Sequence, residues 1–300
     1  MVKRIIMLVL VIAAAASAQT RWWEEEQSAR AAIEERTVAD DFKSRINWED
    51  GFMEVTAGGT CNVEKAKTKA QCYSMAVKTA RHLAIEKLAE IVYGVRIDAD
   101  NLFVNEVEED VELKTYTEGL IKGAYEIAQQ QTEFEDGSVW VEVTLGLVLT
   151  GEKGLSSAVI PWIQRRAQVA PAKQFALAGS ASIDVGGATG LIIDASGLGV
   201  KPAMAPRVMV QGRDEELYGR VNMDRAAAVR FGVVGYTDSI DKARALKERV
   251  GENPLVVKAV GVGGAHSADV LLSTDEAARV VAANMKSGFF KECRVVFVVG

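Results

Sequence analysis

The stretch from Glu64 to Tyr93 constrains the fold more than any other part of this sequence, because its apolar residues recur at steps of three and four. That spacing places them on one face of a helix with 3.6 residues per turn. Gly94 follows the last of them, where helices commonly end on a residue with positive φ. A helix of roughly 45 Å, at about 1.5 Å per residue, must bury this face against another layer. The predicted buried positions are Ala66, Ala70, Tyr73, Val77, Ala80, Ala84, Leu88 and Ile91.

The segments on either side of this helix have the alternation of β-strands. Polar and apolar residues alternate from Phe52 to Ala57 and again from Val139 to Leu145. Asp136 and Gly137, just before the second segment, are typical of a hairpin turn. We expect Trp140 of this hairpin to be buried in the core. Residues 47–150 are therefore predicted to form an α+β domain in which one long helix packs on an antiparallel sheet.

The C-terminal part has a different pattern, in which short apolar strands alternate with helices. Residues 151–182, which include Pro161 and Pro171, are interpreted as a linker with a short helix at 163–169. Residues 183–300 are predicted to form a mixed α/β domain. The run VVFVV near its end has no polar alternation, so it predicts a central strand covered on both faces. The predicted strands are 191–194, 207–210, 231–234, 255–260, 269–272 and 294–298, and the predicted helices are 239–249 and 274–285.

The N-terminus has the features of an export signal. Lys3 and Arg4 precede an apolar run from Ile5 to Ala16, and small residues at 16–18 predict cleavage before Gln19. The run has about 12 residues, whereas a membrane-spanning helix needs about 20. The sequence therefore predicts a signal peptide at 1–18, a helical extension at 19–46, no transmembrane anchor, and a periplasmic or secreted mature protein.

Cysteine usage fits that compartment. Cys61 lies just before the long helix and Cys72 lies within it, so a disulfide between them would tie the incoming strand to the helix. By the chain-entropy model such a loop closure stabilises by about 3 kcal/mol. Two buried free thiols are the alternative. Cys293, inside an apolar run, is expected to be a buried small hydrophobe.

Composition and motifs favour no enzyme class, and we predict neither a catalytic residue nor a cofactor nor a metal. A net charge of −6 argues against nucleic-acid binding, which requires a gathered basic face. The two histidines, His82 and His266, have no zinc-ligand spacing and no nucleophile elbow beside them. The acidic run from Glu106 to Glu112 lacks the residue spacing of a calcium loop, so we interpret it as a solvated loop or a helix start.

Two glycine-rich turns could cradle an anion with free backbone N–H groups. The run 261–267 follows a strand but lacks both the P-loop and the dinucleotide-binding signatures. The run 186–199 leads to the best polar cluster of the C-terminal domain, namely Asp194, Ser196 and Lys201. Any small-ligand site is predicted there.

The order of elements in residues 47–150 resembles a bacterial envelope module. The residues that carry this resemblance are AKTKAQCYSMAVKTARHLAIEKLAEIVYGVRI and, after the hairpin, DGSVWVEVTLGL. They are similar to the family of small outer-membrane lipoproteins that includes flagellar FlgP, and to the N-terminal domain of the flagellar assembly protein FlgT. The chain departs from the lipoproteins because it has no cysteine at the predicted cleavage point. The resemblance implies a non-catalytic envelope role in flagellar or surface assembly.

Two hypotheses for function follow. The first is an exported protein that binds other envelope proteins, such as flagellar or outer-membrane components, or copies of itself. Trp22, Trp23 and Trp48 are its candidate contacts, because exposed aromatic residues concentrate interface energy. The second is a periplasmic ligand-binding protein or enzyme that uses the glycine-rich turns. A concave polar pocket at Asp194, Ser196 and Lys201 would favour the second hypothesis.

Overall fold

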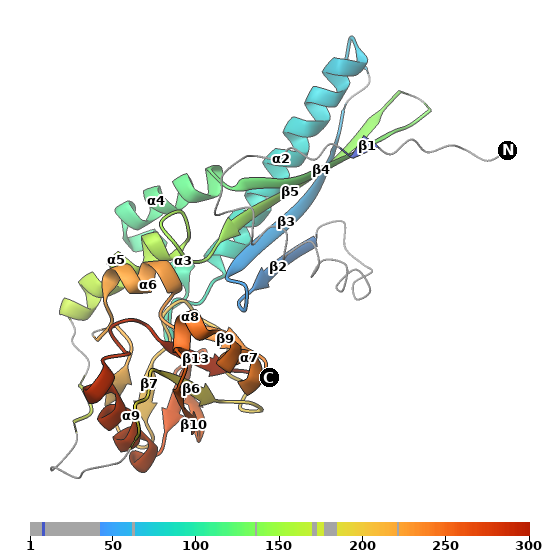
Figure 1. Ribbon diagram of the computed structural model, residues 1–300. Coiled ribbons are helices and arrows are strands. Elements are labelled where there is room, and N and C mark those ends of the chain that lie inside the picture. The colour runs from blue at the N-terminus through green and yellow to red at the C-terminus, as the bar shows by residue number, and fades with distance from the viewer. Residues whose placement is uncertain are drawn as a thin grey trace. The chain divides into compact units, whose positions relative to one another are not determined.

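The computed structural model describes residues 8–9, 43–61, 64–135, 137–169, 173–176, 185–220 and 222–300 (Figure 1). Its contacts divide the chain into two units, each made of separate pieces of sequence. The helix–sheet unit comprises Met1–Arg45, Glu54–Leu88 and Ala124–Gly146, and the α/β unit comprises Ile46–Met53, Ala89–Gly123 and Leu147–Gly300. Because both units are discontinuous, the linear boundaries near 47, 150 and 183 stay predictions.

The predicted fold class is confirmed, since a helix packs on an antiparallel sheet in the N-terminal part and helices accompany parallel and mixed sheets in the C-terminal part. Within the described ranges, no helix has both the length and the apolar character needed to cross a bilayer. The strands are β1 (Leu8–Val9), β2 (Lys43–Asn47), β3 (Phe52–Thr60), β4 (Tyr125–Glu133), β5 (Val139–Val148), β6 (Gly190–Asp194), β7 (Val208–Val210), β8 (Glu216–Tyr218), β9 (Gly235–Thr237), β10 (Pro254–Lys258), β11 (Gly261–Gly263), β12 (Asp269–Leu272) and β13 (Val295–Val298). The helices are α2 (Lys69–Tyr93), α3 (Phe103–Glu109), α4 (Val111–Lys122), α5 (Ser156–Val169), α6 (Arg225–Phe231), α7 (Ile240–Ala245), α8 (Lys247–Val250) and α9 (Thr274–Ser287).

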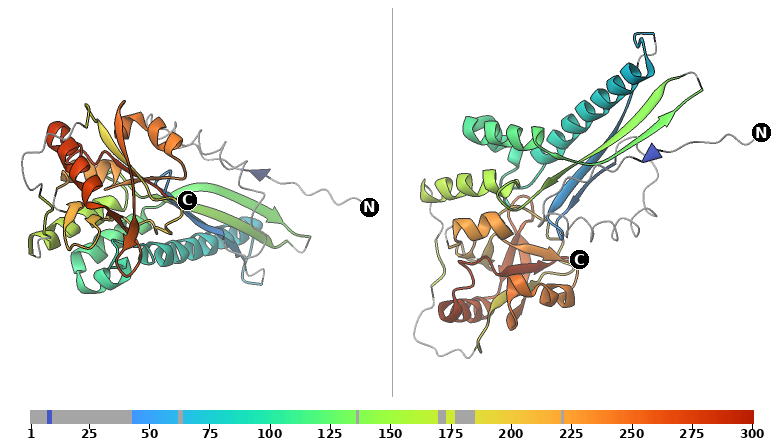
Figure 2. Two further views of the ribbon diagram at one scale, coloured as in Figure 1. Left: turned by 90° about the horizontal axis from the view of Figure 1, so that it is seen from below. Right: turned by 45° about the horizontal axis from the view of Figure 1, so that its top comes forward.

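The sheet of the helix–sheet unit has the strand order β1-β4-β5-β3-β2, and α2 runs along one of its faces (Figure 2). The helix begins at Lys69 rather than Glu64, and its buried positions recur every four residues. Of the predicted buried positions, Ala80, Ala84 and Leu88 are buried, Ala70 is exposed, and the half-buried ones are Ala66, Tyr73, Val77 and Ile91. Small side chains are the physical reason, because they let the helix lie close to the sheet. A Cβ atom on Gly59 of β3 would overlap the backbone of Ala76 and Ala80. The fully buried line is Cys72, Ala76, Ala80, Ala84, Leu88 and Val92.

Trp140 corrects a second expectation, because 36% of its surface is exposed rather than buried in the core. It alternates along β5 with the buried residues Val139 and Val141, so it lies on the face of the sheet away from α2. Its indole covers Gly58 on the neighbouring strand β3, where a Cβ atom would overlap the ring. An aromatic side chain over a cross-strand glycine covers the backbone that glycine leaves bare.

The α/β unit contains two four-stranded sheets, with orders β10-β6-β13-β9 and β11-β12-β7-β8. All pairings in the first sheet are parallel. Strand β13 lies between β6 and β9, and each of its four residues is buried, which confirms the prediction of a central strand covered on both faces. Apolar side chains of α7, α8 and β13, including Ile240, Ala243, Val250 and Val296, form a buried cluster against Ile192 of β6.

Three predicted elements of this unit are displaced. The strand expected at 231–234 is instead the end of α6, which terminates at Gly232 with φ of 76°, and the strand is β9. The helix expected at 239–249 is divided into α7 and α8, because Leu246 has a non-helical ψ of 56°. In the predicted linker, α5 begins at Ser156 and continues through Pro161. The apolar pattern of the sequence could not show where these helices begin and end, because the backbone dihedral angles of single residues decide it.

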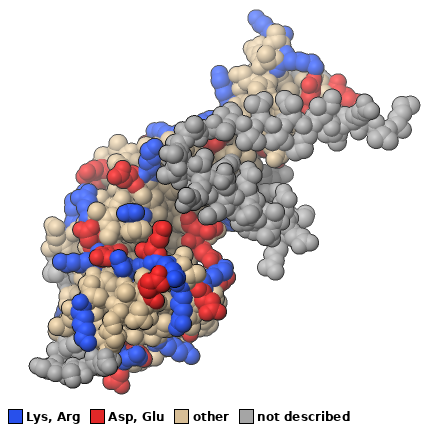
Figure 3. Space-filling view, in the orientation of Figure 1, with Lys and Arg blue, Asp and Glu red and all other residues tan. Residues whose placement is uncertain are grey.

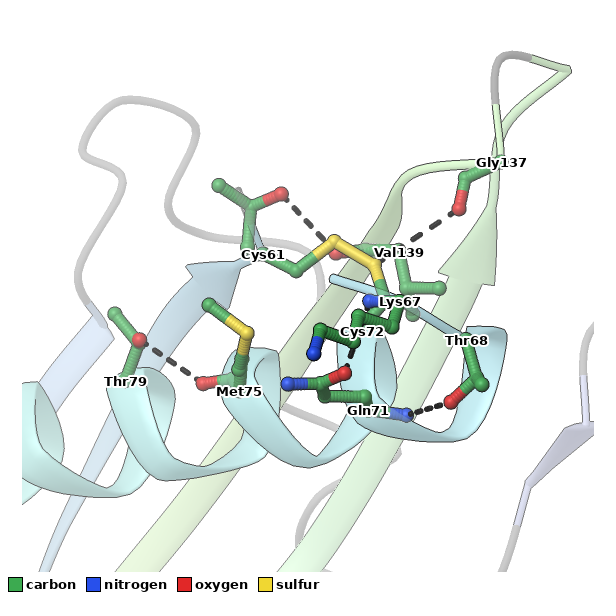
Figure 4. The surroundings of a disulfide bond; sticks show 10 residues. Cys61, Lys67, Thr68, Gln71, Cys72, Met75, Thr79, Gly137 and Val139 are labelled. Atoms are coloured by element: carbon green, nitrogen blue, oxygen red, sulfur yellow. Dashed lines mark hydrogen bonds between the residues drawn. A yellow bond between two sulfur atoms is a disulfide. The ribbon is translucent and has the colours of Figure 1, made fainter. Parts of the chain in front are cut away.

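The predicted disulfide is present, and it joins Cys61 at the end of β3 to Cys72 in the first turn of α2 (Figure 4). Both cysteines are buried, and their Cα atoms are 5.1 Å apart. The bridge closes a short loop between two elements that pack on each other. Cys293, by contrast, is a buried free thiol, as predicted.

We expect removal of this bridge to destabilise the helix–sheet unit. The double variant Cys61→Ala/Cys72→Ala should lose about 3 kcal/mol in free energy of unfolding, because the unfolded chain regains the entropy that the closed loop removes. Denaturant unfolding of oxidised protein measures the loss. Adding a reductant should destabilise the wild type to a similar extent and leave the double variant unchanged. A wild type that is insensitive to reductant would contradict this prediction.

Candidate functional site

The predicted ligand cluster begins at Asp194, the last residue of β6. Its carboxylate accepts hydrogen bonds from the side chain and backbone N–H of Ser196, and these lower the pKa of Asp194. Asp194 lies beside Lys258 in the parallel register of β6 and β10. The Lys201 backbone N–H donates to the carbonyl oxygen of Ser267 at 2.9 Å. In the part of the chain that the structure describes, no hydrogen bond or ion pair joins the Lys201 ammonium to Asp194 or Ser196.

Two hollows stand out on the described surface of the α/β unit, and neither includes this cluster. One has a volume of about 360 Å³ and lies at the amino ends of β6 and β13. Its lining contains the glycine pair Gly186 and Gly187 with the basic residues Lys286 and Arg294. The other, of about 120 Å³, is bordered by Trp48, Tyr236 and Arg249. A ligand role for Asp194, Ser196 and Lys201 stays a prediction.

The second glycine-rich run, residues 261–267, lies against the turn that follows α2. Gly264 has a φ of 76°, and a Cβ atom there would overlap Ala99. The backbone N–H of His266 donates to the carbonyl oxygen of Ala99 at 2.7 Å. The N–H of Ala265 donates to the Asp100 carboxylate at 3.4 Å. The loop thus holds an anion, but that anion is a carboxylate of the same chain.

Arg207 lies at the centre of the most extensive buried ionic cluster described in the α/β unit. Its Nε atom donates to Asp269 Oδ2, and its Nη2 atom donates to Asp100 Oδ2, each at 2.7 Å. Its backbone N–H donates to the other oxygen of Asp269 at 2.8 Å. Burial lowers the pKa of Arg207, but the hydrogen bond and charge of Asp269 outweigh this and hold the pKa above its usual value. Arg207 therefore remains a cation.

The same cluster contains an excess of buried acid. Asp98 is buried, accepts hydrogen bonds from the backbone of Asp100 and Asn101, and lies 4.0 Å from Arg220. Glu216 on β8 is fully buried, and neither of its carboxylate oxygens has a hydrogen-bond partner among the described residues. Burial raises the pKa of Glu216, although the charges of Arg220 and Arg207 oppose the shift. Burial also raises the pKa of Asp269.

The sequence analysis did not identify this ionic cluster. Its members are Asp98, Asp100, Arg207, Glu216, Arg220 and Asp269. They come from three stretches of the chain, at 98–100, 207–220 and 269. None of them stands in a motif. The one available signal was Asp269, a charged residue at the start of an apolar strand, because charged residues are rarely buried unless they are paired.

The acidic run from Glu106 to Glu112 lies in helices, as one of its two interpretations predicted. Glu106 is in the first turn of α3, and Glu112 is in the first turn of α4. The run spans the end of α3 and the beginning of α4, where the Asp110 side chain accepts from the backbone N–H of Leu113. Glu106 pairs with Arg166 of α5, and Arg165 lies 3.5 Å from Asp110. Among the described residues, no group of three or more histidine, cysteine, aspartate or glutamate side chains could hold a metal.

The three candidate aromatic contacts have different outcomes. Trp48 is half-buried, and its ring packs edge-on against Tyr236 at 5.7 Å. Trp22 and Trp23 lie outside the described residues.

Acidic and basic side chains are interleaved over the face in Figure 3, with no large patch of one sign.

A family model described as the second domain of Treponema pallidum Tp0624 matches residues 190–300. The comparison with curated proteins found no significant match. The matched residues lie within the α/β unit, from β6 to the end of the chain. They include Arg207, Glu216, Arg220 and Asp269, but not Asp98 or Asp100.

Arg207 should be essential for stability. We expect Arg207→Ala to lower the free energy of unfolding by about 3–5 kcal/mol, because it leaves the buried Asp269 carboxylate without its cation. Arg213→Ala is the matched control. Arg213 pairs with Glu215 in solvent, so its loss should cost less than about 1 kcal/mol. Denaturant unfolding measures both variants, and equal effects would contradict the prediction.

Glu216 should make the fold less stable as the pH rises. The pKa of Glu216 in the folded state exceeds the usual 4.5. Its contribution to the free energy of unfolding is therefore fully present below pH 4.5, and it is lost as the pH rises through the folded-state pKa. Glu216→Gln cannot ionise, and its stability relative to wild type should therefore increase from pH 4.5 toward neutrality. Part of the slope should remain in the variant, since Asp269 shifts in the same direction.

Unfolding free energies between pH 4.5 and pH 8 test this prediction, with Glu215→Gln as the control for loss of a more exposed carboxylate on the adjacent residue. A constant difference between Glu216→Gln and wild type across this range would refute it.

Proposed function

We propose that this chain is an exported, non-catalytic protein of the cell envelope that works by binding other proteins. The charged and apolar pattern of residues 1–18 supports export, and so does the Cys61–Cys72 disulfide, which persists in oxidising compartments. The periplasm or the cell exterior is the proposed location.

The observation that carries this proposal is that a buried arginine and a glycine-rich loop both bind a carboxylate of the same chain. Arg207 and the backbone of the loop 261–267 both bind Asp100 of the same chain. An enzyme or receptor keeps such groups free for its ligand. Here they fix one segment of the α/β unit to another, and this supports a protein that presents surfaces rather than a reaction centre.

The proposed partners are other envelope proteins, including flagellar or outer-membrane components. The resemblance of residues 47–150 to the FlgP lipoproteins and the FlgT N-terminal domain supports this class. The similarity of residues 190–300 to a second domain of another protein supports a modular chain in which this part accompanies other domains. Trp22 and Trp23 are the proposed aromatic contacts, since Trp48 packs on Tyr236.

The test uses the mature chain from Gln19 onward, affinity-tagged and expressed with its signal in the native cells. Fractionation should place it in the periplasm or the medium. Crosslinking, affinity capture and mass spectrometry should recover envelope proteins. Trp22→Ala/Trp23→Ala should reduce recovery at least tenfold, because an aromatic anchor contributes about 2 kcal/mol or more. Arg30→Ala is the control from the same segment. Cytoplasmic location, or recovery of no envelope protein above background, would overturn the proposal.

A small-ligand function is the second candidate, and the hollow of about 360 Å³ favours it. Gly186 and Gly187 of the glycine-rich turn line this hollow together with Lys286, Arg294 and Glu292, and the Glu292 carboxylate pairs with Arg294. A small anion held by Lys286 is the class of ligand that this lining would attract. Thermal stabilisation of the full mature chain by a panel of phosphates and carboxylates tests this candidate. A genuine site should lose that stabilisation in Lys286→Ala/Arg294→Ala.

A further inference from the structure

Among the residues that the structure describes, strand β4 has little strand cover along its outer side. The sheet order is β1-β4-β5-β3-β2, so β4 has β5 on one side and only the two-residue strand β1 on the other. Leu8 and Val9 of β1 pair antiparallel with Gln131 and Gln130. The nine residues of β4 thus have a described strand partner on this side at only two positions.

The two edges of the sheet differ in their protection against pairing with another chain. Natural edge strands avoid such pairing by being short, by carrying charged residues or proline, or by containing a β-bulge. Strand β2, at the opposite edge, has five residues that include Lys43 and Arg45. Strand β4 has the sequence YEIAQQQTE, with no basic residue and no proline. The register of β4 with β5 shifts between Glu126 and Ala128. Residues 128–132, beyond this irregularity, pair regularly with β5 and carry no charge, so this segment lacks the features that prevent strand addition.

The helix α2 holds β4 in place from one face. Gln129 hydrogen bonds to Tyr73, Glu126 pairs with Arg81 at 2.7 Å, and Glu133 pairs with Lys69. Side chains alternate along the strand beyond the register shift between Glu126 and Ala128, so Ala128 and Gln130 on either side of Gln129 lie on the face away from α2. The backbone of β4 is thus preorganised for pairing, and its two acidic residues already have basic partners.

We propose that β4 of the mature protein pairs antiparallel with β4 of a second copy of this chain, forming one continuous sheet across the dimer. The inference rests on the proposed export, because cleavage before Gln19 removes Leu8 and Val9 from this edge. A twofold axis at Gln130 places Gln129 opposite Gln131 and Ala128 opposite Thr132, all within the regular part of the strand. An axis at Gln129 places Ala128 opposite Gln130, and neither register pairs two acids within residues 128–132.

The self-complementary sequence selects a second copy over an unrelated strand. Like charges directly opposite each other destabilise strand pairing, and β4 avoids them in both of these registers. Identical strands related by a twofold axis pair through the same surface on each subunit, which closes the assembly at two chains. Residues 128–132 of β4 already have the extended conformation that this pairing needs.

The test measures the mass of residues 19–300 by light scattering or sedimentation at micromolar to tens of micromolar concentration. The wild type should have the mass of a dimer. Ala128→Lys/Gln130→Lys should be monomeric, since it places lysine opposite lysine when the axis is at either Gln129 or Gln130. Both substitutions lie on the face away from α2, and an unchanged melting temperature of the monomer would show that the fold is intact.

Glu142→Lys is the matched control, because Glu142 is the direct partner of Gln130 on β5, which is an interior strand. It should remain dimeric. Hydrogen exchange should show backbone amides of β4 protected in the dimer and exposed in the lysine variant.

A monomeric wild type, or a dimer that survives the lysine substitutions, would overturn the proposal. Capture of an envelope protein by a monomeric wild type, abolished by those substitutions, would assign the edge to that partner and also overturn pairing between copies. Fractionation of the native cells judges export separately, so failure of dimerisation and failure of the proposed function are distinguishable.

Discussion

The buried ion pair between Arg207 and Asp269 is the interaction on which the α/β unit depends. Asp269 begins β12, and its carboxylate binds both the backbone and the guanidinium of Arg207, the residue before β7. Burying either charge alone would cost several kcal/mol, so each residue requires the other. Arg207 then extends to Asp100 and secures the turn after α2. A single guanidinium thus fixes three segments that are distant in sequence.

Close packing of small residues has the equivalent role in the helix–sheet unit. Gly59 meets the backbone of α2 at Ala76 and Ala80, which leaves no room for a larger side chain. The adjacent disulfide joins the end of β3 to the first turn of the helix. One face of the sheet is covered in this way, and Trp140 partly covers the other over Gly58. Among the described residues, only the two-residue strand β1 pairs with the outer edge of β4.

These two arrangements support the same interpretation of function. The α/β unit uses Arg207 and its glycine-rich loop to hold its own acidic turn, and residues 128–132 of β4 in the helix–sheet unit carry no charge. We take both features as support for the proposed association with proteins. The hollow at Gly186, Gly187, Lys286 and Arg294 is the place where a small-ligand role would be found.

Local sequence determined the type of most elements and the pairing of Cys61 with Cys72, because periodicity, turn residues and short sequence separation are local properties. It also identified β13 as central, since an unbroken apolar run needs cover on both faces. It failed where one residue changes the backbone direction, as at Gly232 and Leu246. It also placed part of the buried face of α2 on Tyr73 and Val77, because hydrophobicity alone does not show how closely a helix can approach a sheet.

The ionic cluster shows what only the tertiary structure decided. Asp98, Arg207 and Asp269 are unremarkable charged residues in the sequence, and each could equally lie in solvent. Folding places them together in a region from which water is excluded, where an unpaired charge is costly and a paired one is stable. The sequence by itself therefore determined which segments become helices and strands. The tertiary structure decided which polar residues meet, because that depends on contacts between segments far apart along the chain.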